Sequence, residues 1–464
     1  MMPSPGAVEG WRRFVYIRAK PGVAVQHAGF MKNFLRQHWG ALFLSVIALS
    51  FVGAQAFLSA HRTTTVKHLY FADRLTDAHR MLIDEYNRQH EGHIKVIPID
   101  FPNADFTTNE RKEILARFLR GEGDGIDVFA VDVIWVQRFE RWSEPLDQYF
   151  TKAELAGISD EGLQSCYKDG KLVAIPLGLV RGTLLYREDL LRSLPGGDRI
   201  IEKVNRGITW EEFVKYGETV RPSFPFYLFP AAEYEGLICV YNEVLQNCQA
   251  DYFKIHGFDF DTPQAARALQ LLVDLVQKYR VTPQVVTSMT EVSSYDYFRQ
   301  HNGCFIRGWT SYYRDFPEMT EGKRTIRQAP LPRFADGPPA STIGGWDLMV
   351  SKFSSEKVEA IAFIKFLLQK ESQEVIYTRA GYFPAIRALY EEEAYRVKYP
   401  ELTDISQMST HGVHRPSHSN YTKYSEILAH YVSQAIRGRL TVEDALHLAT
   451  KDINAGKVLL TQGQ

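Results

Sequence analysis

The sequence has few cysteines and no pattern of metal ligands. Four cysteines occur in 464 residues, and no two of them form a CxxC pair. A zinc-binding or thioredoxin-like motif is therefore excluded. The one histidine cluster, His411, His414 and His418, contains Pro416, which breaks a helix, so we expect a loop there and no metal site.

The cysteine spacing limits the possible disulfides. Cys239 and Cys248 fall within one predicted helix, about 13 Å apart along its axis. That separation is too large for a disulfide. We expect mostly buried free thiols, with a long-range bridge as the alternative.

Basic residues are not in excess in the body of the chain. Residues 1–62 carry seven Lys or Arg and one acid, which leaves 47 basic and 54 acidic residues after them. This balance gives no nucleic-acid surface. With 45% hydrophobic and 23% charged residues, the chain is globular, and its length suggests two or three domains.

Long apolar runs are absent except for Trp39–Ala60. Basic residues precede it, and Ala54 and Ala56 form a small-x-small cleavage site, so residues 31–60 are predicted to be a signal peptide cut after Ala56. The run of about 22 residues is also long enough to remain as an inner-membrane anchor. Either way the body is exported to the periplasm. Residues 1–30 are an N-terminal extension or a mis-assigned start.

Strands and helices alternate after residue 65. Runs rich in β-branched residues predict strands, and apolar residues at helical spacing predict helices. This alternation favours an α/β fold with parallel strands. The predicted strands are Val66–Ala72, Ile94–Ile99 and Ile126–Val133, and the predicted helices are Asp77–Gln89 and Thr108–Arg120.

Asp132 and Trp135 stand near the carboxyl end of the third predicted strand. Ligands of open α/β sheets collect beyond such strand ends. A carboxylate beside an indole suits a polyhydroxylated ligand, because the acid accepts hydrogen bonds from hydroxyls and the ring packs on C–H groups. The alternative is that Asp132 caps the next helix and Trp135 lies in the core.

Seven further segments, with the strand at Asp132, resemble in order those of family 1 extracellular solute-binding proteins. These are the sugar-binding subunits of ABC importers, and the similarity is greatest to their trehalose/maltose-binding branch. The resemblance covers about residues 66–450. The segments are Lys171–Leu191, Thr209–Phe213, Tyr234–Cys239, Phe298–Tyr313, Ala329–Pro332 followed by Ile343–Lys352, Ala380–Pro384 and Arg415–Ser417.

The resemblance implies a type II periplasmic-binding-protein fold, with two α/β lobes, hinge crossings and a ligand cleft between the lobes. Lobe I would comprise residues 66–179 and 340–381, and lobe II residues 182–335 and 385–460. The implied function is binding of a sugar, such as a disaccharide, and its delivery to a permease and its ATPase. The chain would be a monomer without enzymatic activity or a cofactor.

The resemblance also implies the ligand-binding residues. Charged groups would bind hydroxyls, tryptophans would stack on sugar rings, and glycines would let the backbone approach the ligand. Each has an alternative: Arg111 as a surface residue paired with Glu110 or Glu113, Glu235 as a first-turn acid, the tryptophans in the core rather than at loop edges, and Arg415 in a structural ion pair. The candidates are Arg111, Asp132, Gly344, Gly345 and Trp346 in lobe I, and Tyr234, Glu235, Trp309, Tyr312 and Arg415 in lobe II.

One segment departs from the pattern of that branch. Gly178–Arg181 stands where an aromatic residue and an aspartate are usual. Arg181 is therefore a further candidate for ligand binding. The departure predicts a ligand other than that of the branch: a different sugar, an acidic sugar or a non-sugar solute. A glycoside hydrolase using Asp132 and Glu235 is disfavoured, because the two acids would lie on lobes that move. A sensor tethered by residues 39–60 remains an alternative.

Overall fold

The computed structural model describes residues 39–40, 43–45, 47–51, 66–101, 108–122, 125–314, 325–400, 402 and 412–457. The chain divides into two compact units, Met1–Thr65 and Val66–Gln464. The described residues of the first unit are helical. In the described parts of the chain, no helix combines the length and apolarity needed to cross a membrane. The predicted extension 1–30 and the cleavage site at Ala56 lie outside the described residues.

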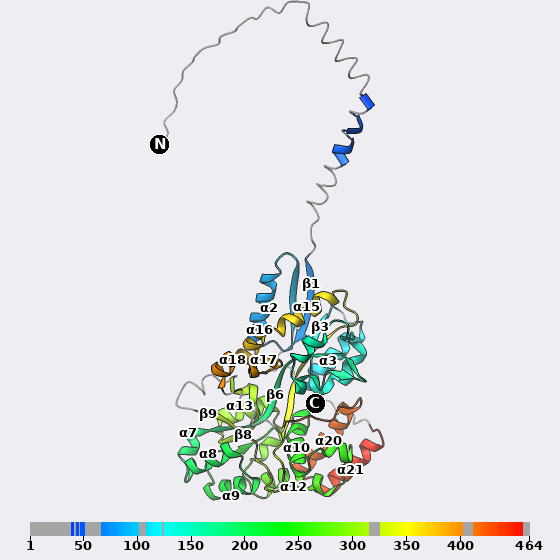
Figure 1. Cartoon of the computed structure of the whole chain (residues 1–464). Helices are drawn as coiled ribbons and strands as arrows, with labels where there is room; N and C mark the ends of the chain where they lie inside the picture. The colour runs from blue at the N-terminus through cyan, green and yellow to red at the C-terminus, as the bar shows by residue number, and fades with distance from the viewer. Residues whose placement is uncertain are drawn as a thin grey trace, which may run out of the picture. The chain divides into compact units, whose positions relative to one another are not determined.

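The second unit alternates strands and helices (Figure 1). Its strands are β1 Lys67–Asp73, β2 Ile94–Asp100, β3 Val128–Asp132, β4 Tyr167–Lys168, β5 Lys171–Leu172, β6 Ile175–Arg187, β7 Tyr227–Leu228, β8 Phe305–Trp309, β9 Ile326–Ala329, β10 Ser341–Val350, β11 Phe383–Pro384 and β12 Gly412–Val413. Its longer helices are α2 Asp77–Gln89, α3 Thr108–Arg120, α8 Gly197–Arg206, α9 Trp210–Val220, α10 Glu235–Cys248, α12 Pro263–Gln277, α13 Glu291–Gln300, α15 Lys357–Leu367, α20 Tyr421–Ile436 and α21 Val442–Asn454. Its shorter helices are α4 Val136–Phe139, α5 Lys152–Ala156, α6 Asp160–Leu163, α7 Glu188–Arg192, α11 Tyr252–His256, α16 Lys370–Val375, α17 Ala388–Glu391 and α18 Glu393–Lys398, and its single turns are η1 Val133–Trp135, η2 Glu140–Trp142, η3 Gln284–Ser288, η4 Thr310–Arg314 and η5 Ile376–Ala380.

One long strand, β6, connects two sheet regions. Among the described residues the main sheet has the strand order β2-β1-β3-β10-β6-β8-β7. β1 is parallel to β2 and β3, whereas β10 is antiparallel to β3 and β6. The first half of β6 pairs with β10 and β11, and its second half pairs with β8 and β9. The predicted crossing at Lys171–Leu191 is therefore confirmed as this strand.

Among the described residues, two large hydrophobic cores flank this strand, and a small cluster lies around Leu179 and Phe383. The first core gathers buried residues of β1, β3, α2 and α15, with Phe71 and Phe129 fully covered. The second core gathers residues of α10, α12, α20, α21 and β8, with Phe260 and Phe305 fully covered. Figure 1 shows these elements in two halves of the body, joined by β6. The predicted α/β fold is thus confirmed, with one core in each half.

Local sequence signals correctly predicted most of the strands and helices named in the sequence analysis. α2 begins at Asp77 and ends at Gln89 as predicted, because Thr76 caps its first turn in a capping box with His79. The third strand is shorter than predicted and ends at Asp132, since the next three residues coil into η1. Asp132 accepts a hydrogen bond from the backbone N–H of Ile134 at 3.1 Å, so it caps that turn.

The cysteine prediction is confirmed. Cys239 and Cys248 both lie on α10, and all four cysteines are within the described residues as free thiols. Three of them are buried, and burial raises the pKa of Cys166 well above its usual range. His414 and His418 lie outside helices and strands, as expected, whereas His411 is outside the described residues.

Candidate ligand-binding site

A cavity of about 330 Å³ lies in the second unit, with walls from both sheet regions. This volume is near the lower end of the range for small-molecule sites. Ten of the eleven predicted site residues line it: Arg111, Asp132, Tyr234, Glu235, Trp309, Tyr312, Gly344, Gly345, Trp346 and Arg415. Residues that were not predicted to bind the ligand also line it, namely Arg74, Glu110, Val180, Gly236, Cys239, Thr290, Glu291, Val292, Ser293, Asp296, Ser311 and Tyr382.

Strand pairing brings Asp132 and Trp346 together. Asp132 is the last residue of β3, and Trp346 stands opposite it in β10. Trp346 is half-buried, and it also pairs with Gly178 on β6. The interpretation as a loop-edge residue is wrong for Trp346, which lies inside β10, whereas Trp309 ends β8 directly before the turn η4. Both indoles nevertheless line the cavity.

Arg415 connects two carboxylates that come from different halves of the body. Its Nη2 donates to Oδ1 of Asp132 at 2.6 Å, and its Nη1 donates to Oε1 of Glu235 at 2.9 Å. The hydroxyl of Tyr421 donates to the same Glu235 oxygen at 2.7 Å. Arg415 therefore is a structural ion pair as well as a cavity residue. Its buried Nε has no hydrogen-bond partner in the described part of the chain.

The charge of Arg415 is maintained despite its burial. Burial would lower the pKa of the guanidinium, but Asp132, Cys239 and Glu235 raise it well above its usual value. Arg111, the candidate for a surface residue paired with Glu110 or Glu113, is also buried. The alternative that Arg111 is a solvated helix residue is therefore wrong, and Glu113 pairs with Arg138 at 2.9 Å.

Arg111 and Trp346 are in direct contact. The Cζ atom of Arg111 lies 4.5 Å from the centroid of the Trp346 ring, the geometry of a cation–π pair. Burial lowers the pKa of Arg111, and the nearby carboxylates of Asp73 and Asp132 oppose that fall. α3 thus supplies a guanidinium, and β10 supplies an aromatic face beside it.

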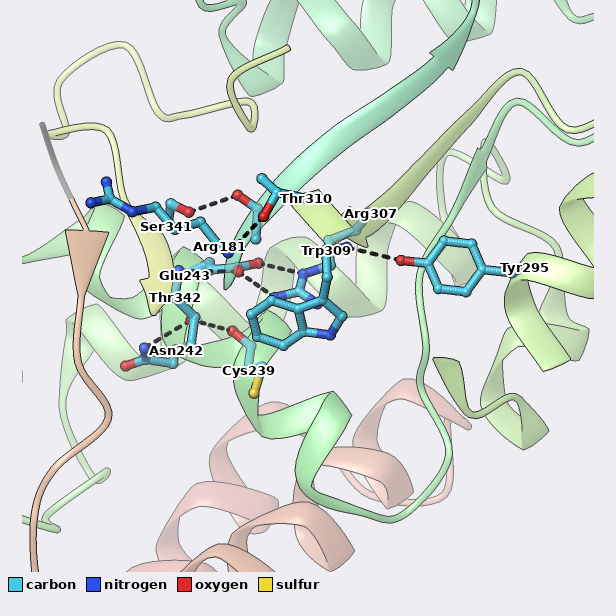
Figure 2. Close-up of polar contacts among 11 residues, drawn as sticks. Arg181, Cys239, Asn242, Glu243, Tyr295, Arg307, Trp309, Thr310, Ser341 and Thr342 are labelled. Atoms are coloured by element: carbon cyan, nitrogen blue, oxygen red, sulfur yellow. Dashed lines mark hydrogen bonds and ion pairs between the residues drawn. The ribbon is translucent and has the colours of Figure 1, made fainter. Parts of the chain in front are cut away.

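Tyr295 holds the backbone of Trp309. Its backbone N–H donates to the hydroxyl of Tyr295 at 2.9 Å (Figure 2). The Tyr312 ring stacks on Tyr295 with centroids 3.8 Å apart and an angle of 10°. The Trp309 side chain packs against the first core although β8 belongs to the second. Its ring therefore lies where the two halves meet.

The two glycines of β10 are required by close packing. Gly345 has φ of +144°, and a Cβ on it would lie 2.5 Å from the carbonyl oxygen of Gly178. A Cβ on Gly344 would lie 3.1 Å from the ring of Trp309. A side chain at either position would displace β6 or the indole. Their role in backbone approach to a ligand remains a prediction, and the observed reason for glycine is strand packing.

Side-chain placement bears on two of the sequence interpretations. Trp135 is 3% exposed in the first core and does not line the cavity, so the core alternative holds for it. Arg181 does not line the cavity either. Its guanidinium pairs with Glu161, and Val180 takes the cavity side of β6. The prediction that Arg181 contacts the ligand therefore gains no support from its placement.

Two further cavity residues, Arg74 and Tyr382, could have been predicted from the sequence. Arg74 directly follows the carboxyl end of β1, where ligands collect in α/β sheets. Its Nη2 donates to the hydroxyl of Tyr382 at 3.3 Å. Tyr382 lies in the Ala380–Pro384 segment that carried the family resemblance. By contrast, the start of α13, where Glu291 accepts a hydrogen bond from Tyr234, had no such signal.

A two-lobed α/β body with a polar and aromatic cavity between its halves defines a small-molecule binding protein. The family model of bacterial extracellular solute-binding proteins matches residues 72–374, and the chain belongs to that family. Members of this family are binding components of ABC transporters and are not enzymes. The body of the chain is accordingly exported.

Individual relatives agree with this assignment. A probable ABC transporter-binding protein of Deinococcus radiodurans is 26% identical over 350 residues, 75% of this chain and 82% of that protein. The solved structure described as maltose-bound T. maritima MalE3 has a TM-score of 0.75 and 26% identity, over 84% of this chain and 100% of that one. A solute-binding protein of Thermotoga lettingae bound with α-D-tagatose has a TM-score of 0.72 and 20% identity, over 84% and 99%, and supports the fold alone.

Proposed function

We propose that the protein binds a neutral sugar of about disaccharide size and delivers it to the permease of an ABC importer. One observation carries this proposal: two half-buried indoles, Trp309 and Trp346, share one cavity with the charged groups of Arg111, Asp132 and Arg415. Aromatic faces match the C–H faces of sugar rings, and charged groups make strong hydrogen bonds to hydroxyls. This combination favours a polyhydroxylated ligand over a purely apolar one.

The charged groups would provide direction, and the indoles would provide burial. The Asp132 and Glu235 oxygens would accept from sugar hydroxyls, while Arg111 and Arg415 would donate to them. Losing one buried polar partner weakens binding by about 1–3 kcal/mol, or about five- to a hundredfold. Tyr234 and Tyr312 would close the second side of the cavity.

The comparisons support a sugar as the ligand. The T. maritima relative was solved with maltose at 26% identity, which agrees with a place in the trehalose/maltose-binding branch. An acidic sugar is the less favoured ligand, because Arg181 pairs with Glu161 away from the cavity. The cavity volume of about 330 Å³ suits a small saccharide rather than a long chain.

Binding would be accompanied by closure of two lobes. Residues 66–179 with 340–381 would form lobe I, and residues 182–335 with 385–460 would form lobe II, in agreement with the two hydrophobic cores. β6 would serve as one crossing between them. Residues 31–60 would direct export, either as a signal peptide cut after Ala56 or as a membrane anchor, and the mature protein would act as a monomer with its permease and ATPase.

Thermal unfolding with a panel of ligands tests this proposal. The panel contains neutral mono- and disaccharides, sugar acids and sugar phosphates. A ligand that binds only the folded state adds about 2.7 kcal/mol at a hundredfold excess over Kd. We expect the unfolding temperature to rise with a neutral disaccharide and not with its acid. No shift with any sugar would overturn the proposal.

A further inference from the structure

A buried ion pair lies behind the cavity wall without lining the cavity. Arg307 on β8 donates from Nε to Oε2 of Glu243 at 3.0 Å and from Nη2 to Oε1 at 2.5 Å. Arg307 is 1% exposed and Glu243 is 5% exposed. Figure 2 shows the pair directly behind the indole of Trp309. Glu243 is on α10, so this contact links a helix of the second core to β8.

The pair fixes the indole of Trp309 on one side. The Cζ atom of Arg307 lies 4.0 Å from the centroid of the Trp309 ring. Two hydrogen bonds to one carboxylate hold the guanidinium plane in place, which a single bond would not do. Glu243 bonds to Arg307, and Arg307 lies against the ring. Glu243 therefore acts on the orientation of the ring through Arg307.

The same carboxylate holds the beginning of β10. The backbone N–H of Thr342 donates to Oε1 of Glu243 at 3.2 Å, and the Thr342 hydroxyl donates to the carbonyl oxygen of Cys239 at 3.0 Å. Asn242 donates to that hydroxyl at 3.0 Å. Thr342 precedes Gly344 by two residues, so these bonds fix the strand that leads to Trp346.

Glu243 also occupies space beside β6. A Cβ on Gly182 would lie 1.9 Å from its Oε1 and 2.8 Å from Nη2 of Arg307. Gly182 pairs with Trp309 across the β6–β8 ladder, and its carbonyl accepts from Ser341 at 2.6 Å. One buried carboxylate therefore contacts three strands, and each of them continues into the cavity wall.

Stability alone does not account for this arrangement. Removing two charges from water costs about as much as their attraction returns, so well-packed apolar residues would stabilise the fold equally well. A pair with such geometry instead fixes the orientation of the groups around it. We propose that Glu243 is a positioning residue of the sugar site, which through Arg307 orients the Trp309 ring and through Thr342 sets β10 for Trp346. This inference rests on the proposed function, because the ligand is the group that those rings contact.

The test replaces the pair by apolar residues of similar size, Glu243→Leu with Arg307→Met. A matched control is Asp189→Asn, which weakens another ion pair of the second half: Arg187 donates to Asp189 at 2.8 and 2.6 Å, and neither residue lines the cavity. Binding of the disaccharide identified in the ligand panel is measured by calorimetry, and stability is measured by the unfolding temperature.

We expect the double variant to stay folded with a somewhat lower unfolding temperature, because the buried N–H of Thr342 loses its acceptor, while its Kd rises about tenfold. The control should lower the unfolding temperature and leave Kd unchanged. A wild-type Kd in the double variant would overturn the inference. The inference would also be overturned if both variants lost affinity in proportion to their loss of stability.

A readout without ligand separates this inference from the proposed function. In protein labelled with 5-fluorotryptophan, the resonance of Trp309 is assigned by its loss in Trp309→Phe. In Glu243→Leu with Arg307→Met we expect that resonance to shift and broaden, whereas the core residue Trp210 keeps its signal. An unchanged Trp309 resonance would contradict the positioning role, whether or not the wild type binds a sugar. Failure of the wild type to bind any sugar would remove the proposed function alone.

Discussion

The guanidinium of Arg111 lies over the indole of Trp346, with Cζ 4.5 Å from the ring centroid. The two residues come from α3 and from β10, far apart in the sequence, and both line the cavity. A planar guanidinium that stacks on a ring still has N–H donors at its edge. The pair therefore combines, at one place, a surface for a sugar ring and donors for its hydroxyls.

Replacing Trp346 by alanine should weaken sugar binding by more than tenfold and leave the protein folded. The ring is only half-buried, so it contributes less to the core than to the cavity wall. Calorimetry gives the Kd, and circular dichroism gives the unfolding curve. The matched control is Trp135→Ala, which removes a ring that is 3% exposed and should lower the unfolding free energy by about 3–5 kcal/mol. Equal destabilisation by both changes would show that Trp346 is a core residue.

Replacing Arg181 by alanine should leave the affinity for neutral sugars unchanged. Its side chain pairs with Glu161, and Val180 lines the cavity in its place. This ion pair is partly buried, with 13% of the Arg181 side chain and 27% of the Glu161 side chain exposed, so its loss should lower the unfolding temperature only modestly. The measurement is a binding titration of the variant beside the wild type with a neutral disaccharide and its acid. A selective loss of binding to the acid would place Arg181 in the site after all.

Removal of the Arg415 side chain charge should be strongly destabilising. Arg415→Met leaves the buried Glu235 and the partly buried Asp132 without their cation, a change that costs about 3–5 kcal/mol. Denaturant unfolding measures this loss. Adding Asp132→Asn and Glu235→Gln should recover most of it, because no unpaired charge then remains. An unchanged unfolding free energy in Arg415→Met would mean that the two ion pairs do not form in solution.

Asp347 should make the stability depend on pH. Burial raises its pKa to about 7, and Ser165, which donates to Oδ2 at 2.7 Å, opposes the rise. The folded protein then binds a proton that the unfolded chain releases near pH 4, so the unfolding free energy falls as the pH rises from about 4 to about 7. Asp347→Asn cannot titrate, and its stability relative to the wild type should increase over that window by on the order of 4 kcal/mol. A constant difference between pH 4 and pH 8 would contradict the raised pKa.

Local sequence patterns predicted the elements well where a cap or a buried run marks their ends. α2 illustrates this, since Thr76 sets its first residue. The placement of single side chains was harder. Alternation along β6 could have shown that Arg181 faces away from Val180, because successive residues of a strand point to opposite sides. The core position of Trp135 depends on packing by α3, whose Lys112 Nζ lies 5.3 Å from its ring, and nothing near Trp135 in the sequence records that contact.

The site was predicted through family resemblance more than through spacing. The pairing of Asp132 with Trp346 depends on the antiparallel register of β10 with β3, which no local pattern reveals. The Glu243–Arg307 pair joins residues 64 positions apart on different elements. Both are products of the tertiary fold. Sequence reasoning therefore identified the residues that line the cavity more readily than those that hold them in place.

The proposed function requires that a sugar binds between Trp309 and Trp346. Calorimetric titration of maltose into the wild type and into the double variant Trp309→Ala with Trp346→Ala tests it most directly. We predict one-to-one binding by the wild type, and at least a roughly hundredfold weaker Kd in the variant at an unchanged circular dichroism spectrum. Maltose binding of equal affinity in both proteins, or no binding by the wild type of maltose or of any other sugar in the panel, would contradict the account.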